Sequence, residues 1–356
     1  MIENIQQARR LTKKYKISVE DIILIVLNCL GVNADILEKR IRFKLRLQNT
    51  NQLFYIAICV NNSKSPFFLW GDKLFLKDKF IGTASEIEND TCDSTYFRRN
   101  KTALTLNSNS RSQCRGCKFC GTYNLDPNDL SNLTTEDGLT KYLKSFLHQN
   151  KMKDLSNLVD VGICTGCFKD ERDTLEHILM VREILKKFRF NKELKYLGSQ
   201  IISEEALGIL EKHAMPFSLY FTVECFTRRR KLLHPVKTNI TISKIKKILC
   251  SALKRNFNTN ILYILGLDSI GDVINGIREL KPYLTHFPII NVFQNYLPEQ
   301  EALRIPEARQ IEYYLEARKQ IEKIFIKSNL RPRLWENYRG LWYFRFADKE
   351  LKGVKI

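Results

Sequence analysis

Between residues 101 and 300, apolar runs rich in β-branched and aromatic residues alternate with amphipathic helical segments, and this alternation narrows the choice of folds more than any other feature. Strands separated by helices predict a parallel sheet, because parallel neighbours need a long crossover connection. The expected strands are 103–107, 158–164, 194–197, 217–224, 260–266 and 287–293, and the expected helices are 134–150, 171–188, 203–213, 242–253, 270–280 and 307–327. Such an alternation fits an open doubly wound sheet or an incomplete βα barrel, and in both folds the chemistry lies at the carboxyl ends of the strands.

The segments on either side lack this regular alternation of strands and helices, and we divide the chain into three regions accordingly. Residues 1–100 form an α+β accessory region, with an apolar helical stretch at 19–30, strand-like runs at 53–60 and 67–75, and a polar stretch at 82–95 that we interpret as a loop. Residues 101–300 form the βα region. Residues 301–356 form a C-terminal cap, made of a long helix and a segment rich in Trp and Arg at 331–342. The large side chains of that segment favour burial against the sheet, although they could also line a substrate entrance.

The composition is that of a packed globular protein. Of the 356 residues, 44% are hydrophobic and 27% are charged, which excludes a disordered or low-complexity chain. The best apolar run, 22–32, is too short to span a bilayer and no secretory signal is visible, so we expect a cytoplasmic protein without membrane association. Lys and Arg outnumber Asp and Glu by 58 to 39, a net charge of +19 that suits anionic partners. The cations are spread along the chain and are densest at 228–255, so a solvated basic surface is the simpler interpretation.

The cysteines carry the strongest chemical signal. The chain has 10 of them and no secretory signal, which favours metal ligation over a disulfide framework. Cys114, Cys117 and Cys120 have two residues between each pair and follow the expected strand 103–107, so their thiolates can converge on one metal centre from one loop. A closed zinc site needs four ligands, whereas a 4Fe–4S cluster held by three cysteines leaves one iron free. A zinc knuckle with Cys92 or a histidine as fourth ligand is the alternative.

With these residues in view, the segment resembles the cluster loop of the radical S-adenosylmethionine (radical SAM) superfamily. In that family the loop follows the first strand of a partial βα barrel, and an aromatic residue such as Phe119 precedes the last cysteine. The first spacing here is one residue shorter than the usual family pattern. The resemblance covers about residues 100–300, and overall it is more similar to the biotin-synthase-like branch of the family than to its other branches. It implies an α/β fold, a partial (β/α)6 TIM-type barrel, and a 4Fe–4S cluster on the three cysteines.

The same resemblance implies where S-adenosylmethionine would bind. Gly162 and Thr165, at the end of the second strand, would hold its amino group. Glu224, at the end of the fourth strand, would bind the ribose hydroxyls or the amine, and Arg228 nearby would take the carboxylate. Leu265 lies in the fifth strand, which in the family contacts the adenine.

Two further features have competing interpretations. Cys164 and Cys167 form a second CxxC pair, which is either a structural pair at the end of a buried strand or a redox or auxiliary-cluster site. His177 lies in the expected helix 171–188, and we expect it to face solvent.

The function implied by the resemblance is radical chemistry. One electron from an external reductant of flavodoxin or ferredoxin type would cleave S-adenosylmethionine, and the resulting 5′-deoxyadenosyl radical would abstract hydrogen from a small-molecule substrate. Modification of tRNA or of a peptide is the first alternative, since the net charge of +19 would matter there. A non-catalytic, zinc-dependent nucleic-acid-binding protein is the second. Walker, GxGxxG, HExxH and GxSxG motifs are missing, which disfavours nucleotide hydrolases, dehydrogenases and serine hydrolases.

Overall fold

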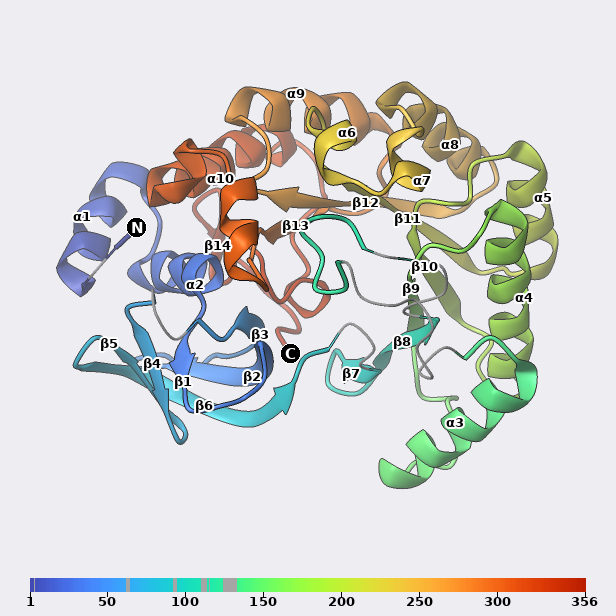
Figure 1. Ribbon diagram of the computed structural model, residues 1–356, viewed down its shortest axis with the longest axis horizontal. Helices are drawn as coiled ribbons and strands as arrows, with labels where there is room; N and C mark the ends of the chain where they lie inside the picture. The colour runs from blue at the N-terminus through green and yellow to red at the C-terminus, as the bar shows by residue number, and fades with distance from the viewer. Residues whose placement is uncertain (3, 62–64, 92–94, 110–113, 115, 124–132) are drawn as a thin grey trace.

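The computed structural model describes residues 1–2, 4–61, 65–91, 95–109, 114, 116–123 and 133–356, and Figure 1 shows their arrangement. Two sheets dominate it. The N-terminal sheet has the order β1-β4-β5-β6-β2-β3, and the helices α1 (Ile5–Tyr15) and α2 (Val19–Leu30) lie beside it. Its strands are β1 (Asn33–Ala34), β2 (Arg40–Leu47), β3 (Leu53–Cys59), β4 (Phe67–Trp70), β5 (Lys73–Leu76) and β6 (Lys79–Asn89).

Two sequence interpretations of this region were wrong. The run 67–75 is not one strand, because it folds back into the antiparallel hairpin of β4 and β5. The polar stretch 82–95 is not a loop at its start, because β6 pairs with both β2 and β5. Beyond Ala84 the side chains of β6 are exposed, and an antiparallel sheet can leave one face in water, so a central strand here needs little apolar signal.

The second sheet has the order β13-β12-β11-β10-β9-β8-β7 in the described part of the chain. Strands β8 to β13 are all parallel to their neighbours and follow one another in chain order, and β7 pairs antiparallel with β8. The bounds are β7 (Tyr96–Arg98), β8 (Ala103–Asn109), β9 (Asp160–Thr165), β10 (Glu193–Gly198), β11 (Phe217–Glu224), β12 (Asn258–Leu265) and β13 (Ile289–Val292). The expected α/β class with a parallel sheet is confirmed. Because the strand order never reverses, the described sheet has no switch point of the doubly wound kind, and it curls into a half-barrel.

Helices cover the outer face of this curved sheet (Figure 1). They are α3 (Glu136–Gln149), α4 (Glu171–Lys187), α5 (Glu204–His213), α8 (Ile242–Lys254), α9 (Ile270–Leu280) and α10 (Ile311–Phe325). The short helices α6 (Arg229–Leu232) and α7 (Pro235–Thr238) follow β11 at the carboxyl ends of the strands, and 3₁₀ turns lie at Lys281–Tyr283, Pro298–Leu303, Glu307–Arg309 and Leu334–Glu336. Five of these helices, α3, α4, α5, α8 and α9, begin where a Ser, Thr or Asp side chain accepts a backbone N–H from the first turn, at Thr135, Asp170, Ser203, Thr241 and Ser269. Among the described residues, no helix is both long and apolar enough to cross a membrane.

The C-terminal segment joins the two sheets. The backbone N–H of Ala57 on β3 donates to the Tyr338 carbonyl at 3.2 Å, and that of Val292 on β13 donates to the Arg339 carbonyl at 2.7 Å. Since β3 and β13 are edge strands, this segment occupies the gap between the two sheets. The chain ends with the short hairpin β14 (Arg345–Phe346) and β15 (Lys349–Glu350). Trp335 and Trp342 are buried, as their size led us to expect.

Candidate functional site

A cavity of about 320 Å³ lies where the parallel strands end. Its lining comes from the carboxyl ends of β8 to β13, from the N-terminal sheet and from the C-terminal segment. The residues that carry polar or thiol groups into it include Asn107, Cys114, Cys117, Cys120, Thr165, Cys167, Ser199, Thr222, Glu224, Lys237 and Asn291. The chain therefore places its cysteine loop at the end of the sheet where α/β folds carry their chemistry.

The cysteine loop is shaped by its own backbone. The Cys120 N–H donates to the Cys117 carbonyl at 2.8 Å, which closes a tight turn. Gly116 has φ of 78°, and a Cβ there would come within 2.7 Å of the backbone of Tyr123, so only glycine fits this approach. The His234 N–H donates to Cys117 Sγ at 3.4 Å, which ties the loop to the segment that follows β11.

A fourth thiol lies beside the loop. The Cys167 thiol and its backbone N–H both hydrogen-bond to Cys114 Sγ, and Gly116 donates to the same sulfur at 3.3 Å. The bond from the Cys167 thiol, with these backbone donors, lowers the pKa of Cys114 to about 5. The same contact raises the pKa of Cys167. Cys114 is therefore a thiolate at neutral pH, which is the form that binds metals.

The pKa of Cys117, the buried cysteine of the loop, is shifted in the opposite direction. Burial raises the pKa of Cys117 to about 12. Among the residues that the structure describes, no group of three or more His, Cys, Asp or Glu side chains is already arranged to hold a metal ion. Cys92, considered above as a zinc ligand, lies outside the described residues.

The backbone of Glu224 is strained, which is typical of residues at functional sites. Its φ is 67°, in the left-handed region, and the register of β11 against β12 shifts between Thr222 and Glu224. Such a bulge at the end of a strand re-aims a side chain, and non-glycine residues in this region are concentrated at active sites. The Glu224 carboxylate accepts a hydrogen bond from Lys237 Nζ at 2.9 Å. Burial opposes the charge on Lys237, but the Glu224 carboxylate and nearby thiols outweigh it and raise the pKa of the ammonium.

The structure gathers some of the residues implied by the family resemblance and leaves others aside. Phe119, Thr165 and Glu224 line the cavity together with the three cysteines. Gly162 lies deeper in β9, where a Cβ would meet the Arg98 side chain at 3.3 Å.

Arg228 and Leu265 do not line the cavity. Arg228 donates to the carbonyls of Leu267 at 2.9 Å and Leu303 at 2.7 Å, so it braces loops outside the cavity. On β12 the cavity-lining positions are Leu262 and Ile264, and the alternation of a strand places Leu265 on the opposite face.

Sequence reasoning also missed residues. Ser199 follows β10, is 2% exposed, lines the cavity, and its hydroxyl has no hydrogen-bond partner among the described residues. The loop after β9 is clamped by Gln200, which accepts from the Phe168 N–H at 2.7 Å and donates to the Phe168 carbonyl at 3.0 Å. A CxxC pair on the strand next to the cysteine loop was the available signal for Cys167, but no signal marked Ser199.

The expectation that His177 faces solvent was wrong. His177 is buried on the inner side of α4, with Nε2 2.7 Å from Ser108 Oγ and its ring 5.1 Å from that of Phe168. Burial lowers its pKa to about 4, so the imidazole is neutral. Helical periodicity placed it near the polar side of α4, but Ser108 at the end of β8 supplies a buried partner that the pattern could not reveal.

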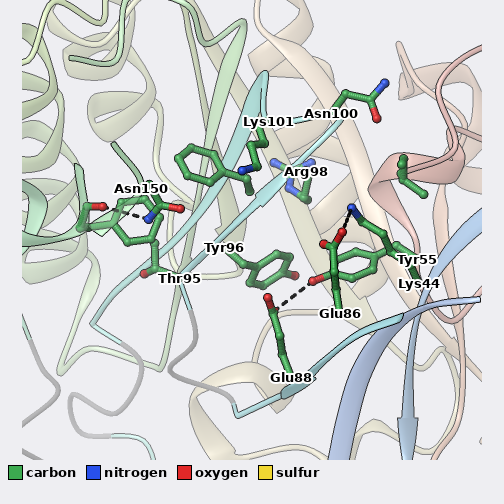
Figure 2. Close-up of a pocket in the computed structure, with 13 residues that line it drawn as sticks. Lys44, Tyr55, Glu86, Glu88, Thr95, Tyr96, Arg98, Asn100, Lys101 and Asn150 are labelled. Atoms are coloured by element: carbon green, nitrogen blue, oxygen red, sulfur yellow. Dashed lines mark hydrogen bonds and ion pairs between the residues drawn. The ribbon is translucent and has the colours of Figure 1, made fainter. Parts of the chain in front are cut away.

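A second cavity, of about 410 Å³, lies between β6 and β7 (Figure 2). Its polar groups are largely paired, since Lys44 contacts Glu86 at 2.6 Å and the Tyr55 hydroxyl donates to Glu88 at 3.1 Å. Tyr96 lines this cavity and also the cysteine cavity. Among its described lining residues there is no thiol, so the metal chemistry belongs to the other cavity.

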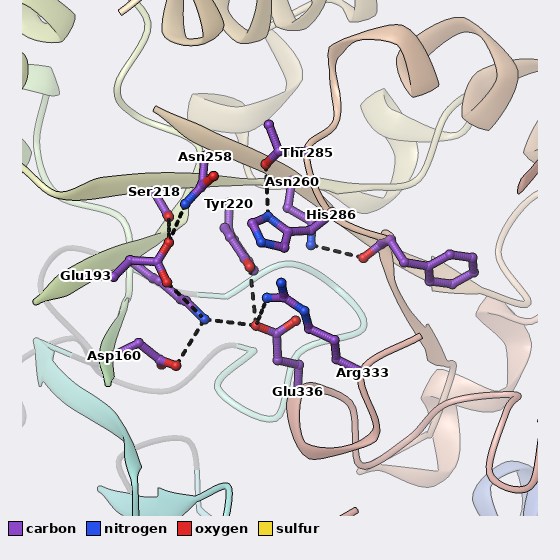
Figure 3. A network of polar contacts seen from close by, with 12 residues as sticks. Asp160, Glu193, Ser218, Tyr220, Asn258, Asn260, Thr285, His286, Arg333 and Glu336 are labelled. Atoms are coloured by element: carbon purple, nitrogen blue, oxygen red, sulfur yellow. Dashed lines mark hydrogen bonds and ion pairs between the residues drawn. The ribbon is translucent and has the colours of Figure 1, made fainter. Parts of the chain in front are cut away.

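Opposite the cysteine cavity, near the amino ends of the strands, a buried ionic network closes the interior (Figure 3). Lys195 Nζ contacts Asp160 at 3.2 Å and Glu336 at 2.9 Å, and the Tyr220 hydroxyl donates to Glu336 at 3.2 Å. Burial works against the charge on Glu336, but Lys195 and Arg333 outweigh it and lower the pKa of its carboxyl to about 2. The C-terminal segment thus contributes the central anion of this network.

Comparisons with known proteins give distant matches only. No protein-family model matches the chain, and no curated protein sequence matches it. The structure of SuiB from Streptococcus suis bound to S-adenosylmethionine aligns at 14% identity over 65% of this chain and 49% of SuiB, with a TM-score of 0.43. TsrM from Kitasatospora setae, a radical S-adenosylmethionine methyltransferase with cobalamin and a 4Fe–4S cluster bound, aligns at 10% identity over 54% of this chain and 36% of TsrM, with a TM-score of 0.36. The chain spans about half or less of these structures, and a likeness this distant assigns no chemistry to it.

Proposed function

We propose that this protein is a radical SAM enzyme in which Cys114, Cys117 and Cys120 hold a 4Fe–4S cluster. The observation that carries the proposal is that these cysteines follow β8, the first parallel strand, and line a cavity at the carboxyl ends of β8 to β13. This is where a partial (β/α)6 TIM-type barrel keeps its chemistry. Nothing in the fold favours the biotin-synthase-like branch, so the proposal stops at the superfamily.

The thiols of this chain fit a cluster. Cys114, Cys117 and Cys120 face one cavity, and Cys114 already has the thiolate character that iron requires. Thr122 Oγ1 lies 3.1 Å from Cys120 Sγ, and the His234 N–H lies 3.4 Å from Cys117 Sγ. Hydrogen bonds to ligand sulfurs are the usual outer support of an iron–sulfur site. When bound, the cluster and S-adenosylmethionine would supply the 5′-deoxyadenosyl radical that abstracts hydrogen from a substrate.

The protein's own part is to position the reactants and keep water out. Glu224, aimed by its bulge, and Thr165 face the cavity as polar contacts for S-adenosylmethionine, and we add Ser199, whose buried hydroxyl has no partner among the described residues. Phe119 is 7% exposed and shields the cysteine turn. Gly162, Arg228 and Leu265, the other positions implied by the resemblance, do not line the cavity, so their part would be to support the residues that do.

The size and place of the cavity favour a small substrate. A volume of about 320 Å³ lies near the lower end of the range of ligand cavities, which runs from roughly 300 to 1,000 Å³. The N-terminal sheet and the C-terminal segment contribute to its wall, through Arg40, Asp90 and Arg339. Because these parts cover the opening of the half-barrel, a small molecule suits this interior better than tRNA.

The external reductant needs a docking surface close to the cysteines. Lys118, between two of the cluster cysteines, is exposed, and its N–H donates to the Leu232 carbonyl at 2.9 Å. Arg230 and Lys231 on α6 are exposed as well. Arg229, buried beside them, donates to the carbonyls of residues 223, 225, 237 and 240, which makes this surface rigid. A rigid basic surface beside the cluster suits an acidic flavodoxin or ferredoxin.

The test is anaerobic reconstitution with iron and sulfide. The wild-type protein should bind iron, show visible absorption, and release 5′-deoxyadenosine from S-adenosylmethionine when dithionite is added. Alanine variants of Cys114, Cys117 and Cys120 should each lose the cluster, whereas Cys250→Ala, on the outer helix α8, should keep it. Binding of zinc in place of iron, or full iron in the three loop variants, would contradict the proposal.

A further inference from the structure

The cations that line the cysteine cavity have a carboxylate partner except at one position. Among the described residues, the lining has the Cys114 thiolate, which accepts hydrogen bonds from Cys167 and Gly116, and the charged side chains of Arg40, Asp90, Glu224, Lys237 and Arg339. Arg40 forms a salt bridge with Asp90, and Lys237 forms one with Glu224 at 2.9 Å. For the Arg339 guanidinium, the described residues provide neither a hydrogen bond nor a carboxylate partner. Among the described residues of this cavity, Arg339 is therefore the cation without a carboxylate partner.

A thiol near Arg339, that of Cys59, does not neutralise its charge. The Cys59 thiol on β3 lies near enough to feel the charges of Arg40 and Arg339. Burial nevertheless raises the pKa of Cys59 to about 11, so this thiol stays uncharged at neutral pH. A half-buried guanidinium without an anion costs free energy, because its hydration is partly lost and nothing replaces it.

The backbone holds Arg339 in place from three sides. Its carbonyl accepts from the Val292 N–H at 2.7 Å, and its own N–H donates to Asn337 Oδ1 at 3.0 Å. The preceding carbonyl, of Tyr338, accepts from the Ala57 N–H at 3.2 Å. The backbone of Arg339 is thus fixed between β13 and β3, so its side chain starts from a defined position on the cavity wall.

A second polar group lies beside it. Asn291 on β13 is 6% exposed and lines the same cavity, and its side-chain amide makes no hydrogen bond to the described residues. Asn291 directly precedes Val292, whose N–H holds the Arg339 carbonyl. A guanidinium fork and an amide N–H₂ group are matched donors for the oxygens of a carboxylate or a phosphate.

We propose that Arg339, assisted by Asn291, binds an anionic oxygen group of the substrate, a carboxylate or a phosphate. The inference rests on the proposed function, because it takes the cysteine cavity as the place of the reaction, and it names the substrate class as a small anionic metabolite. The carboxylate of S-adenosylmethionine is a different anion. The cysteine loop contacts the segments after β9 and β11, through Cys167 and His234, and the turn after β13, through Gln300, whereas Arg339 belongs to the C-terminal segment held between β13 and β3. The two anions are therefore distinguished by the experiment below.

The experiment measures anion binding to the reconstituted protein by calorimetry, with inorganic phosphate and succinate as probes and chloride at matched ionic strength as reference. The wild type should bind one of the two probes saturably. In Arg339→Gln the Kd should rise by about 10- to 100-fold, the loss expected for a hydrogen-bonded charge. Arg339→Lys should lie between the two, and Arg309→Gln, at an exposed arginine outside the cavity, should match the wild type.

Each outcome decides the inference. Saturable binding that is equal in wild type and Arg339→Gln, or no binding beyond the chloride reference, would overturn it. A selective loss of S-adenosylmethionine affinity in Arg339→Gln, with phosphate and succinate unaffected, would also overturn it. Iron content of the same samples is a separate reading, so that a protein without a cluster but with Arg339-dependent anion binding refutes the proposed function and leaves the anion site standing.

Discussion

The Cys167 thiol donates to Cys114 Sγ, although 52 residues separate the two cysteines along the chain. The contact arises because β8 and β9 are parallel neighbours whose carboxyl ends meet at the same edge of the sheet. The loop that carries Cys114 follows β8, and the loop that carries Cys167 follows β9. A donor to a ligand sulfur makes the thiolate form easier to reach, so Cys167 prepares Cys114 for metal binding.

Replacing Cys167 should therefore make Cys114 less reactive in the metal-free protein. Cys167→Ala removes the thiol donor but keeps the backbone N–H donors, so the pKa of Cys114 should rise from about 5 toward its ordinary value. At a pH near 6, a pKa that moves above the pH by one unit lowers the thiolate fraction about tenfold. Alkylation by iodoacetamide, followed at Cys114 by mass spectrometry, measures this. Cys167→Ser retains a donor and should stay closer to the wild type, and equal rates in all three proteins would show that the contact has no effect.

The sequence predicted the βα region well because its signals are local. Buried strands such as 217–224 and amphipathic helices such as 270–280 depend on neighbours within a few positions, and both were placed with their exact bounds. The triplet of cysteines is also local. Ser199 escaped, and Cys167 and the segment 331–342 that contains Arg339 were noted without a definite role, because all three join the cavity through sheet order and edge pairing, which spacing along the chain does not encode. The roles of the site residues stay predictions.

His177 provides a pH-dependent prediction. Its folded pKa is lowered to about 4 by burial, whereas an unfolded histidine titrates near 6.5. Between these values the unfolded chain binds the proton and the folded one does not, so stability is retained above about pH 6.5 and falls as the pH drops toward 4. The loss attributable to this group is on the order of 2–3 kcal/mol across that range.

Urea unfolding of the wild type and of His177→Gln at pH 7 and at pH 5 tests this. Glutamine keeps a hydrogen-bonding group near Ser108 but does not titrate, so the variant should lose less stability between the two pH values than the wild type. His213→Gln, at an exposed histidine, controls for general pH effects. Identical pH dependence in wild type and His177→Gln would mean that burial does not lower the pKa of His177, which would then be protonated in the folded protein at pH 5.

The network around Lys195 predicts that the C-terminal segment stabilises the half-barrel through Glu336. Lys195 and Glu336 are almost fully buried, with 2% and 5% of their side chains exposed. Glu336→Gln keeps the shape but removes the charge, which leaves two buried cations, Lys195 and Arg98, sharing Asp160, with Glu193 only at 3.6 Å from Lys195. Breaking a buried pair in this way costs about 3–5 kcal/mol. Urea unfolding at pH 7 is the measurement, and the exposed Glu312→Gln on α10 should change stability by less than about 0.5 kcal/mol.

The basic surface of Lys118, Arg230 and Lys231 predicts how the cluster receives its electron. Reversing the charge with Lys118→Glu, Arg230→Glu and Lys231→Glu should slow cluster reduction by an acidic flavodoxin by about 10-fold or more at low salt, since steering by opposite charges raises association rates by 10- to 1,000-fold. The rate with dithionite, a small reductant that needs no docking surface, should stay the same. Lys212→Glu, on the exposed end of α5, is the matched control. Bleaching of the visible absorption in a stopped-flow instrument follows both reactions. If the triple variant were reduced by flavodoxin as fast as the Lys212→Glu protein at every salt concentration, the electron would enter by another face.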